Sequence, residues 1–205
     1  MKTPAAVALT LLLATPAAAQ GLSFRPYGMF AQQSFDAQKT FDAVFDSSSG
    51  SFFGGGLNIT DDDRFYFDIG ASHFKKTGQR AFVNSGQTFK TGIPLTATII
   101  PLEFTGGYRF NKGKRMRPYA GGGVGSYRYE ETSGFATDGE DVDTRHAGAI
   151  FEGGAEFRIS QWVGASADVH YTYVPGILGN AGISKDEGET SLGGFQFRVR
   201  VLVGK

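Results

Sequence analysis

The chain has 205 residues, with 20 Lys and Arg, 20 Asp and Glu and no Cys, so its formal net charge is zero. This balance gives no support to nucleic-acid binding, and the lack of Cys excludes disulfides and thiolate chemistry. The 30 Gly residues lie inside alternating apolar segments, which indicates strands with crowded side chains rather than low complexity.

The N-terminus predicts a secretory signal peptide. Lys2 supplies a positive start, residues 7–14 form a short apolar core, and residues 17–19 (AAA) provide a small-residue cleavage site. The apolar run is too short for a helix to cross about 30 Å of hydrocarbon, and no Cys follows that could carry a lipid anchor. We expect a signal peptide over residues 1–19, cleavage after Ala19, and one domain over residues 20–205.

Eight strand-like segments follow, and their connections alternate in length. The segments are roughly 23–34, 51–60, 64–75, 95–110, 117–129, 146–159, 162–174 and 190–203. Tight turns at 60–63, 111–115 and 160–161 alternate with long polar segments at 35–50, 76–94, 130–145 and 175–189. This alternation is typical of membrane barrels with short periplasmic turns and longer extracellular loops. The sequence predicts an all-β fold: an eight-stranded antiparallel up-and-down transmembrane β-barrel with four long extracellular loops.

The last segment raises the question of which face meets the solvent. Residues 195–203 read FQFRVRVLV, which puts Phe195 and Phe197 on one face and Arg198 on the other. In a soluble periplasmic barrel or sandwich the arginine would face water, whereas in a membrane barrel it would face the interior. The polar faces of the segments contain many Gly but almost no Lys. Gly makes room inside a small barrel and has no use on a solvated face, which favours the membrane barrel.

The inward faces are expected to carry a charge network. Buried charges must be paired, and the arginines and carboxylates on these faces nearly balance. We expect Arg198 and Arg200 to bridge several carboxylates. The predicted interior charge network consists of Arg64, Asp68, Glu103, Arg109, Arg128, Glu152, Glu156, Arg158, Asp168, His170, Arg198 and Arg200.

One hairpin carries a resemblance to a known group. Residues 101–110 read PLEFTGGYRF and precede a Lys-rich turn and RPYAGGGVGSYRY at 117–129. The chain resembles the small eight-stranded outer-membrane barrels, the OmpA/OmpX/OmpW-like proteins that share an outer membrane protein β-barrel domain. The resemblance covers essentially the whole mature chain. It implies a Gram-negative outer-membrane location, with the lipid bilayer and the outer-membrane assembly machinery as partners. The C-terminus departs from the group, whose members usually end on an aromatic residue, because it reads VLVGK.

The resemblance also raises the possibility of enzymatic chemistry, because some eight-stranded barrels act on lipid A. His170, Asp168 and Ser166 share one face of a strand, but residues two apart on a strand are about 6–7 Å apart, which is loose for a proton relay. His73, His146 and His170 are scattered, which argues against a metal site. We therefore interpret His170 as part of the interior network and expect no catalytic residues, no metal and no cofactor.

Three functions remain open. The first is a non-enzymatic structural or surface-interaction role, adhesin-like, with the lumen plugged by the charged network. The second is a narrow channel or small-ligand carrier, and the third is a membrane lipid hydrolase. The crowded interior favours the first. The basic segment at 75–90, with Lys75, Lys76, Arg80 and Lys90, is interpreted as ordinary solvated polarity, and the alternative is a lid or a partner surface.

Overall fold

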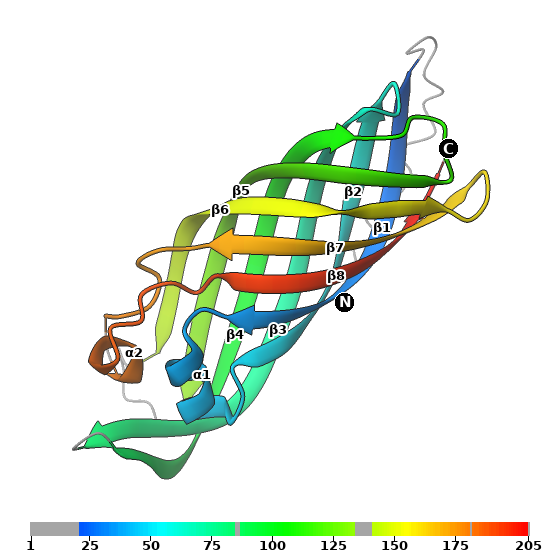
Figure 1. Ribbon diagram of the computed structural model, residues 1–205. Helices are drawn as coiled ribbons and strands as arrows, with labels where there is room; N and C mark the ends of the chain where they lie inside the picture. The colour runs from blue at the N-terminus through cyan, green and yellow to red at the C-terminus, as the bar shows by residue number, and fades with distance from the viewer. Residues whose placement is uncertain (1–20, 85–86, 134–140, 181, 205) are drawn as a thin grey trace, which may run out of the picture.

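The computed structural model describes residues 21–84, 87–133, 141–180 and 182–204. Eight antiparallel strands follow one another around a closed barrel, and β1 also pairs with β8 to complete the ring (Figure 1). This confirms the predicted eight-stranded antiparallel barrel. The strands are β1 Leu22–Phe35, β2 Ser49–Asp61, β3 Phe65–Asn84, β4 Gln87–Arg109, β5 Met116–Ser133, β6 Val142–Arg158, β7 Val163–Tyr173 and β8 Gly194–Val203.

The two ends of the barrel differ. Short turns join β2 to β3, β4 to β5 and β6 to β7 at one end, here called the turn end. Asp62, Asp63 and Asn111 adopt positive φ values of 48°, 58° and 58° in these turns, a conformation that Asp and Asn tolerate better than most residues. The long connections lie at the opposite end, the loop end (Figure 1).

The predicted loop at 76–94 is a projecting β-hairpin, so that prediction was wrong. β3 and β4 are 20 and 23 residues long and continue to pair as far as Asn84 and Gln87. Cross-strand contacts hold the extension together, because the Thr77 and Thr96 hydroxyls are 3.0 Å apart and the Phe82 and Phe89 rings stack with centroids 5.5 Å apart. β5 pairs with β4 only from Leu95 onward, so the hairpin stands beyond its neighbour.

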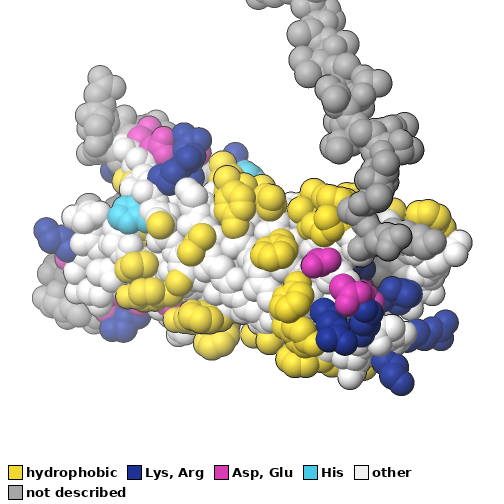
Figure 2. Space-filling view, turned by 90° about the horizontal axis from the view of Figure 1, so that it is seen from above, with side chains coloured by type: hydrophobic (Ala, Val, Ile, Leu, Met, Phe, Trp, Pro, Cys, Tyr) yellow, Lys and Arg dark blue, Asp and Glu magenta, His cyan; other side chains and the backbone are white. Residues whose placement is uncertain are grey.

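Apolar side chains cover the outer wall of the barrel. Phe67, Phe151 and Phe197 are 59%, 63% and 55% exposed. Figure 2 shows hydrophobic side chains distributed over the wall and charged groups gathered towards its two ends. Such an extensive exposed apolar surface is rare on soluble monomers and is the usual outer face of a barrel in a bilayer. No helix in the described part of the chain is long and apolar enough to cross a membrane.

The connections at the loop end fold inward and close the barrel with apolar side chains. The segments 35–50 and 175–189, expected to be polar loops, carry helices α1 (Gln38–Phe45) and α2 (Gly182–Asp186). Phe41 of α1 stacks on Phe35 with ring centroids 3.9 Å apart. The buried loop-end cluster comprises Ala31, Phe35, Ala37, Phe41, Phe45, Phe52, Phe74, Leu95, Ala97, Ile99, Tyr127, Tyr129, Val174, Ile177, Leu178 and Leu192.

Glycines inside the barrel make room for large polar side chains. A Cβ atom on Gly121 would lie 2.3 Å from the Tyr66 hydroxyl, and one on Gly107 would lie 2.6 Å from the same oxygen. A side chain at either position would displace Tyr66. The glycines on the inner wall therefore permit the interior polar contacts, as expected for a barrel of this size.

Candidate functional site

Nine of the twelve residues expected in the interior network meet inside the barrel. Eight of them are buried, and the ninth, Glu103, has a side chain that is 16% exposed. They come from β3, β4, β6, β7 and β8 because side chains of one parity on each strand point inward. The nine are Asp68, Glu103, Arg109, Glu152, Glu156, Asp168, His170, Arg198 and Arg200.

Three expected members are not buried in the lumen. Arg64 is exposed in the turn between β2 and β3, where strand alternation no longer fixes the direction of a side chain. Arg128 lies on the opposite face of β5 from the buried Tyr127 and Tyr129, and it pairs with Glu130 and Asp143 at the loop end. Arg158 is at the end of β6, where its side chain is 48% exposed and approaches Asp63 at the turn-end rim of the lumen.

The structure adds interior residues that the sequence interpretation missed. Arg25 on β1 and Arg117 on β5 are buried, with exposed fractions of 8% and 1%. The Gly run at 121–125 hid the parity of β5. On β1 the exposed Phe24 and Phe30 mark the outer face, a signal that would have placed Arg25 inside. Further polar members are Asn58, Tyr66, Thr105, Tyr119, Tyr127 and Ser166.

The middle of the lumen is organised around two arginines of β8. Arg198 donates from Nε to Asp168 Oδ1 at 2.7 Å and also binds Glu152. Arg200 donates to Asp68 Oδ2 at 2.9 Å and to the Tyr119 hydroxyl at 2.6 Å. Arg200 thus connects β8 to β3 and β5 across the lumen, whereas Arg198 connects β8 to β7 and β6.

His170 lies above this layer, between two carboxylates. Its Nε2 is 3.5 Å from Glu103 Oε1 and its Nδ1 is 3.6 Å from Glu152 Oε2. Its ring is fully buried. The Tyr127 hydroxyl donates to Glu103 at 2.8 Å, so Glu103 is held from two sides. His170 therefore belongs to the charged network that fills the lumen.

The geometry does not favour a nucleophile–base pair at His170. Ser166, the nearest candidate nucleophile on the same face, accepts a hydrogen bond from Arg200 Nε at 3.0 Å, and neither ring nitrogen of His170 has a hydrogen-bond partner among the described residues. A hydrolase needs its nucleophile and base in contact. Among the described residues, one group has the spacing of a metal site, Glu152, Asp168 and His170, with donor atoms within 4.8 Å of one another. Arg198 binds both carboxylates, so a positive charge already occupies that position.

The turn end of the lumen holds a second set of arginines. Arg25 donates to Glu156 Oε1 at 2.6 Å and to Asn58 Oδ1 at 2.7 Å. Arg109 reaches the same two partners, at 3.1 Å from Glu156 Oε2 and 2.7 Å from Asn58 Oδ1. We call this set, together with the neighbouring Asp63, Arg117 and Arg158, the turn-end layer.

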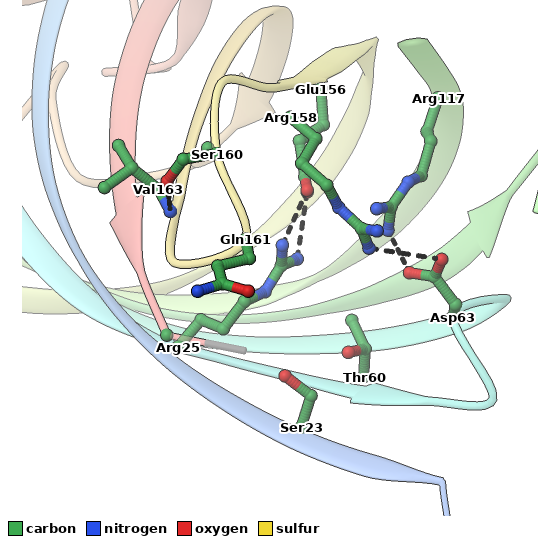
Figure 3. A pocket seen from close by; sticks show the side chains of 12 residues that line it. Ser23, Arg25, Thr60, Asp63, Arg117, Glu156, Arg158, Ser160, Gln161 and Val163 are labelled. Carbon is green, nitrogen blue, oxygen red and sulfur yellow. Dashed lines mark hydrogen bonds and ion pairs between the residues drawn. The ribbon is translucent and has the colours of Figure 1, made fainter. Parts of the chain in front are cut away.

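The turn-end layer borders a cavity of about 190 Å³. Figure 3 shows the guanidinium groups of Arg25, Arg117 and Arg158 side by side in it. Arg117 pairs with Asp63, whereas Arg158 is 3.8 Å from the other oxygen of the same carboxylate. The cavity is therefore lined by cationic groups that converge from β1, β5 and β6.

Charged residues at the loop end join α1 to the β7–β8 connection. Glu189 accepts hydrogen bonds from the backbone N–H groups of Lys39 and Thr40 at 3.0 and 2.8 Å. Residue Ala37, which precedes α1, supplies no side-chain cap, so Glu189 caps the helix from a distant segment. Lys39 Nζ is 2.6 Å from Glu187, and this hydrogen bond raises the pKa of Lys39.

The basic segment of the hairpin also contacts the first loop. Lys76 donates to the carbonyl oxygens of Ser47 and Ser49 at 3.3 and 3.1 Å. Lys90 pairs with Asp46 at 2.5 Å. These two lysines therefore stabilise the loop end, while Lys75 is exposed and has no partner among the described residues.

None of the curated proteins matches the chain, but solved structures resemble it in fold. They include neisserial surface protein A (NspA), 14% identical with a TM-score of 0.54 over 89% of this chain and 96% of that one. Ail from Yersinia pestis, solved with the heparin analogue sucrose octasulfate, is 8% identical with a TM-score of 0.56 over 90% and 99%. The N-terminal barrel of Pseudomonas aeruginosa OprF is 13% identical with a TM-score of 0.50 over 91% and 100%.

The family model of the outer membrane protein beta-barrel domain matches residues 5–201. That span includes β1 to β7, β8 apart from its last two residues, and all the residues of the interior network described above. The chain therefore belongs to the outer membrane protein β-barrel domain family.

Proposed function

We propose that this outer-membrane barrel is a non-enzymatic surface protein, adhesin-like, whose lumen is plugged and whose loops bind molecules outside the cell. The long loops of the barrel are extracellular and its short turns periplasmic, as in other barrels of this architecture. The observation that carries the proposal is the filled lumen below a projecting extracellular hairpin.

The contents of the lumen support a plugged barrel. The Arg198 and Arg200 layer crosses the barrel, and the apolar loop-end cluster closes the space above it. Between them, a cavity bordered by Glu103 and Gln196 has a volume of only about 10 Å³, roughly the space of one water molecule. Passage of a solute would require buried ion pairs to separate, which is costly.

The hairpin supports binding at the surface. Loops on a rigid scaffold are the usual place for binding function. Phe82 and Phe89 are 50% and 43% exposed near the tip of the hairpin, stacked on each other. Exposed stacked aromatic rings and the exposed Lys75 offer apolar and cationic contacts to a partner.

The resemblance to Ail gives one ligand class to test first. Ail was solved with a heparin analogue, so a sulfated polysaccharide is a reasonable probe for this chain.

We also propose that residues 1–19 are a cleaved signal peptide, that residues 20–205 are the barrel domain, and that the outer-membrane assembly machinery is a partner during insertion. Residues 1–20 lie outside the described part of the chain.

The test replaces residues 79–94 by Asn-Gly, which joins Gly78 to Leu95, a directly paired position, through a turn suited to a two-residue hairpin. Wild type and variant are displayed on a Gram-negative host, and binding of labelled heparin and of epithelial cells is measured. We expect the shortened variant to bind at least about tenfold less, equivalent to 1.4 kcal/mol.

A matched control changes the turn end instead. Lys114→Ala with Arg115→Ala alters two exposed residues that face the periplasm, and we expect surface binding to be unchanged. Equal binding by the wild type, the shortened hairpin and a strain without the protein would contradict the proposed surface role.

A further inference from the structure

The turn-end layer contains more arginines than its carboxylates can pair one to one. Arg25 and Arg109 both pair with Glu156, and Arg117 and Arg158 both pair with Asp63. Four arginines therefore share two carboxylates. In the middle of the lumen the ratio is reversed, since Arg198 and Arg200 meet the carboxylates Asp68, Glu103, Glu152 and Asp168.

Buried donors without acceptors are concentrated in the same layer. Among the described residues, the buried arginine nitrogens that lack a hydrogen-bond partner are Arg25 Nε, Arg109 Nε and Nη1, and Arg117 Nη2. All four belong to the turn-end layer, and two of the three arginines that carry them, Arg25 and Arg117, line the cavity itself. A buried donor without an acceptor carries its full desolvation cost, so this layer is suited to a group rich in acceptor oxygens.

The cavity is also lined by residues with hydroxyl groups and is open to solvent at one side. These residues are Ser23, Thr60 and Ser160, and Figure 3 shows the Ser160 hydroxyl next to Val163. The volume of about 190 Å³ is far larger than one water molecule requires. The Arg158 side chain, 48% exposed, forms part of the rim, so a solute from the periplasm can reach it.

We infer that the turn-end cavity is a binding site for a small oxyanion of the phosphate type, taken from the periplasmic side. Arg158 and Arg117 supply charge-assisted hydrogen bonds to the anion, and the hydroxyl groups complete its coordination. Arginine favours such ligands because its planar fork matches two oxygens at once. The surplus of arginines is then a feature of the site and is balanced when the anion is present.

Asp63 is the internal competitor for this anion. Its carboxylate holds Arg117 and approaches Arg158, the two arginines that the anion would use. Asp63→Asn removes the competing charge but keeps the shape, and Asn tolerates the positive φ of 58° found at this position. The variant should therefore bind the anion more tightly, a direction that loss of folding cannot imitate.

The experiment titrates the refolded protein with inorganic phosphate in a nonionic detergent free of phosphate. Binding is followed by NMR shifts of the backbone N–H groups of Gly164 and Gly204, which line the cavity. We expect saturable shifts in the wild type, about tenfold weaker binding for Arg158→Ala, and tighter binding for Asp63→Asn. Arg64→Ala removes an exposed arginine of the same turn outside the cavity and should change the affinity less than about twofold.

A second titration distinguishes a free anion from a lipid headgroup. It uses a soluble short-chain phosphatidylglycerol in the same detergent. Saturation by inorganic phosphate identifies the free anion, and saturation by the lipid alone identifies the headgroup; either supports the site. The inference is overturned if neither probe gives saturable shifts, or if Arg158→Ala and Arg64→Ala bind the probe with equal affinity.

Discussion

Arg198 and Asp168 face each other across the β7–β8 pair and form a buried ion pair, with Nε and Oδ1 2.7 Å apart. Both side chains are almost fully buried, at 4% and 0% exposure. The pair links two neighbouring strands inside the barrel, while Arg198 also reaches Glu152 on β6. Loss of Arg198 should therefore strongly destabilise the interior network.

Replacing Arg198 with Ala should lower the free energy of unfolding by about 3–5 kcal/mol, because it leaves carboxylates buried without a partner. Lys185→Ala on the exposed side of α2 provides the control and should have almost no effect. Guanidinium unfolding in lipid vesicles, followed through the fluorescence of the single Trp162, measures both. Equal effects would mean that Arg198 faces solvent.

Replacing Gly121 with Ala should destabilise the barrel by about 1–3 kcal/mol, the usual cost of overpacking. The added Cβ would lie 2.3 Å from the Tyr66 hydroxyl and 2.5 Å from the Gly106 carbonyl oxygen. It would also disturb the hydrogen bond from Tyr66 to Glu152, 2.8 Å long. Gly28→Ala, where no atom lies within 4 Å of the new Cβ, should be nearly neutral in the same unfolding measurement.

Replacing Glu189 with Ala should loosen α1 without unfolding the barrel. The change removes the acceptor for the backbone N–H groups of Lys39 and Thr40, a cap worth about 1 kcal/mol. Hydrogen exchange of residues 38–45 should become about fivefold faster, following the free-energy difference. Asp186→Ala, an exposed acid in the neighbouring α2, should leave the exchange rates of α1 unchanged.

The N-terminal prediction concerns processing. Residues 17–19 are all Ala, so we expect the mature protein to begin at Gln20. N-terminal sequencing of the protein isolated from outer membranes checks this directly. A different first residue, or an uncleaved chain retained in the inner membrane, would be inconsistent with the signal peptide.

Strand parity was enough to place much of the interior from the sequence. On β8, alternation put Arg198 and Arg200 on the face opposite Phe195 and Phe197, and the structure has them on opposite sides of the wall. Strand parity cannot place a side chain where glycines obscure the alternation or where the strand has ended. The Gly run obscures the alternation of β5, so the sequence assigned Arg128 instead of Arg117 to the interior, and Arg64 lies in a turn outside any strand.

The loop end could not be predicted by the same means. Phe41 and Phe45 are buried because α1 folds back over the barrel and packs against Phe35, a tertiary contact that leaves little signal in an eight-residue helix. The pairing of Glu189 with Lys39 joins segments 150 residues apart. Neither contact follows from local spacing, so the segments were interpreted as polar loops.

The closed lumen is the central claim, and single-channel recording in planar bilayers tests it most directly. Purified protein, with folding verified by heat-modifiable gel mobility, is inserted into the bilayer and recorded at fixed voltage. The ion pairs of Arg198 and Arg200 fill the lumen and the loop-end cluster covers it, so we expect no stable conductance for the wild type. Large, stable ion conductance from the folded protein would contradict the plugged barrel and support the channel function.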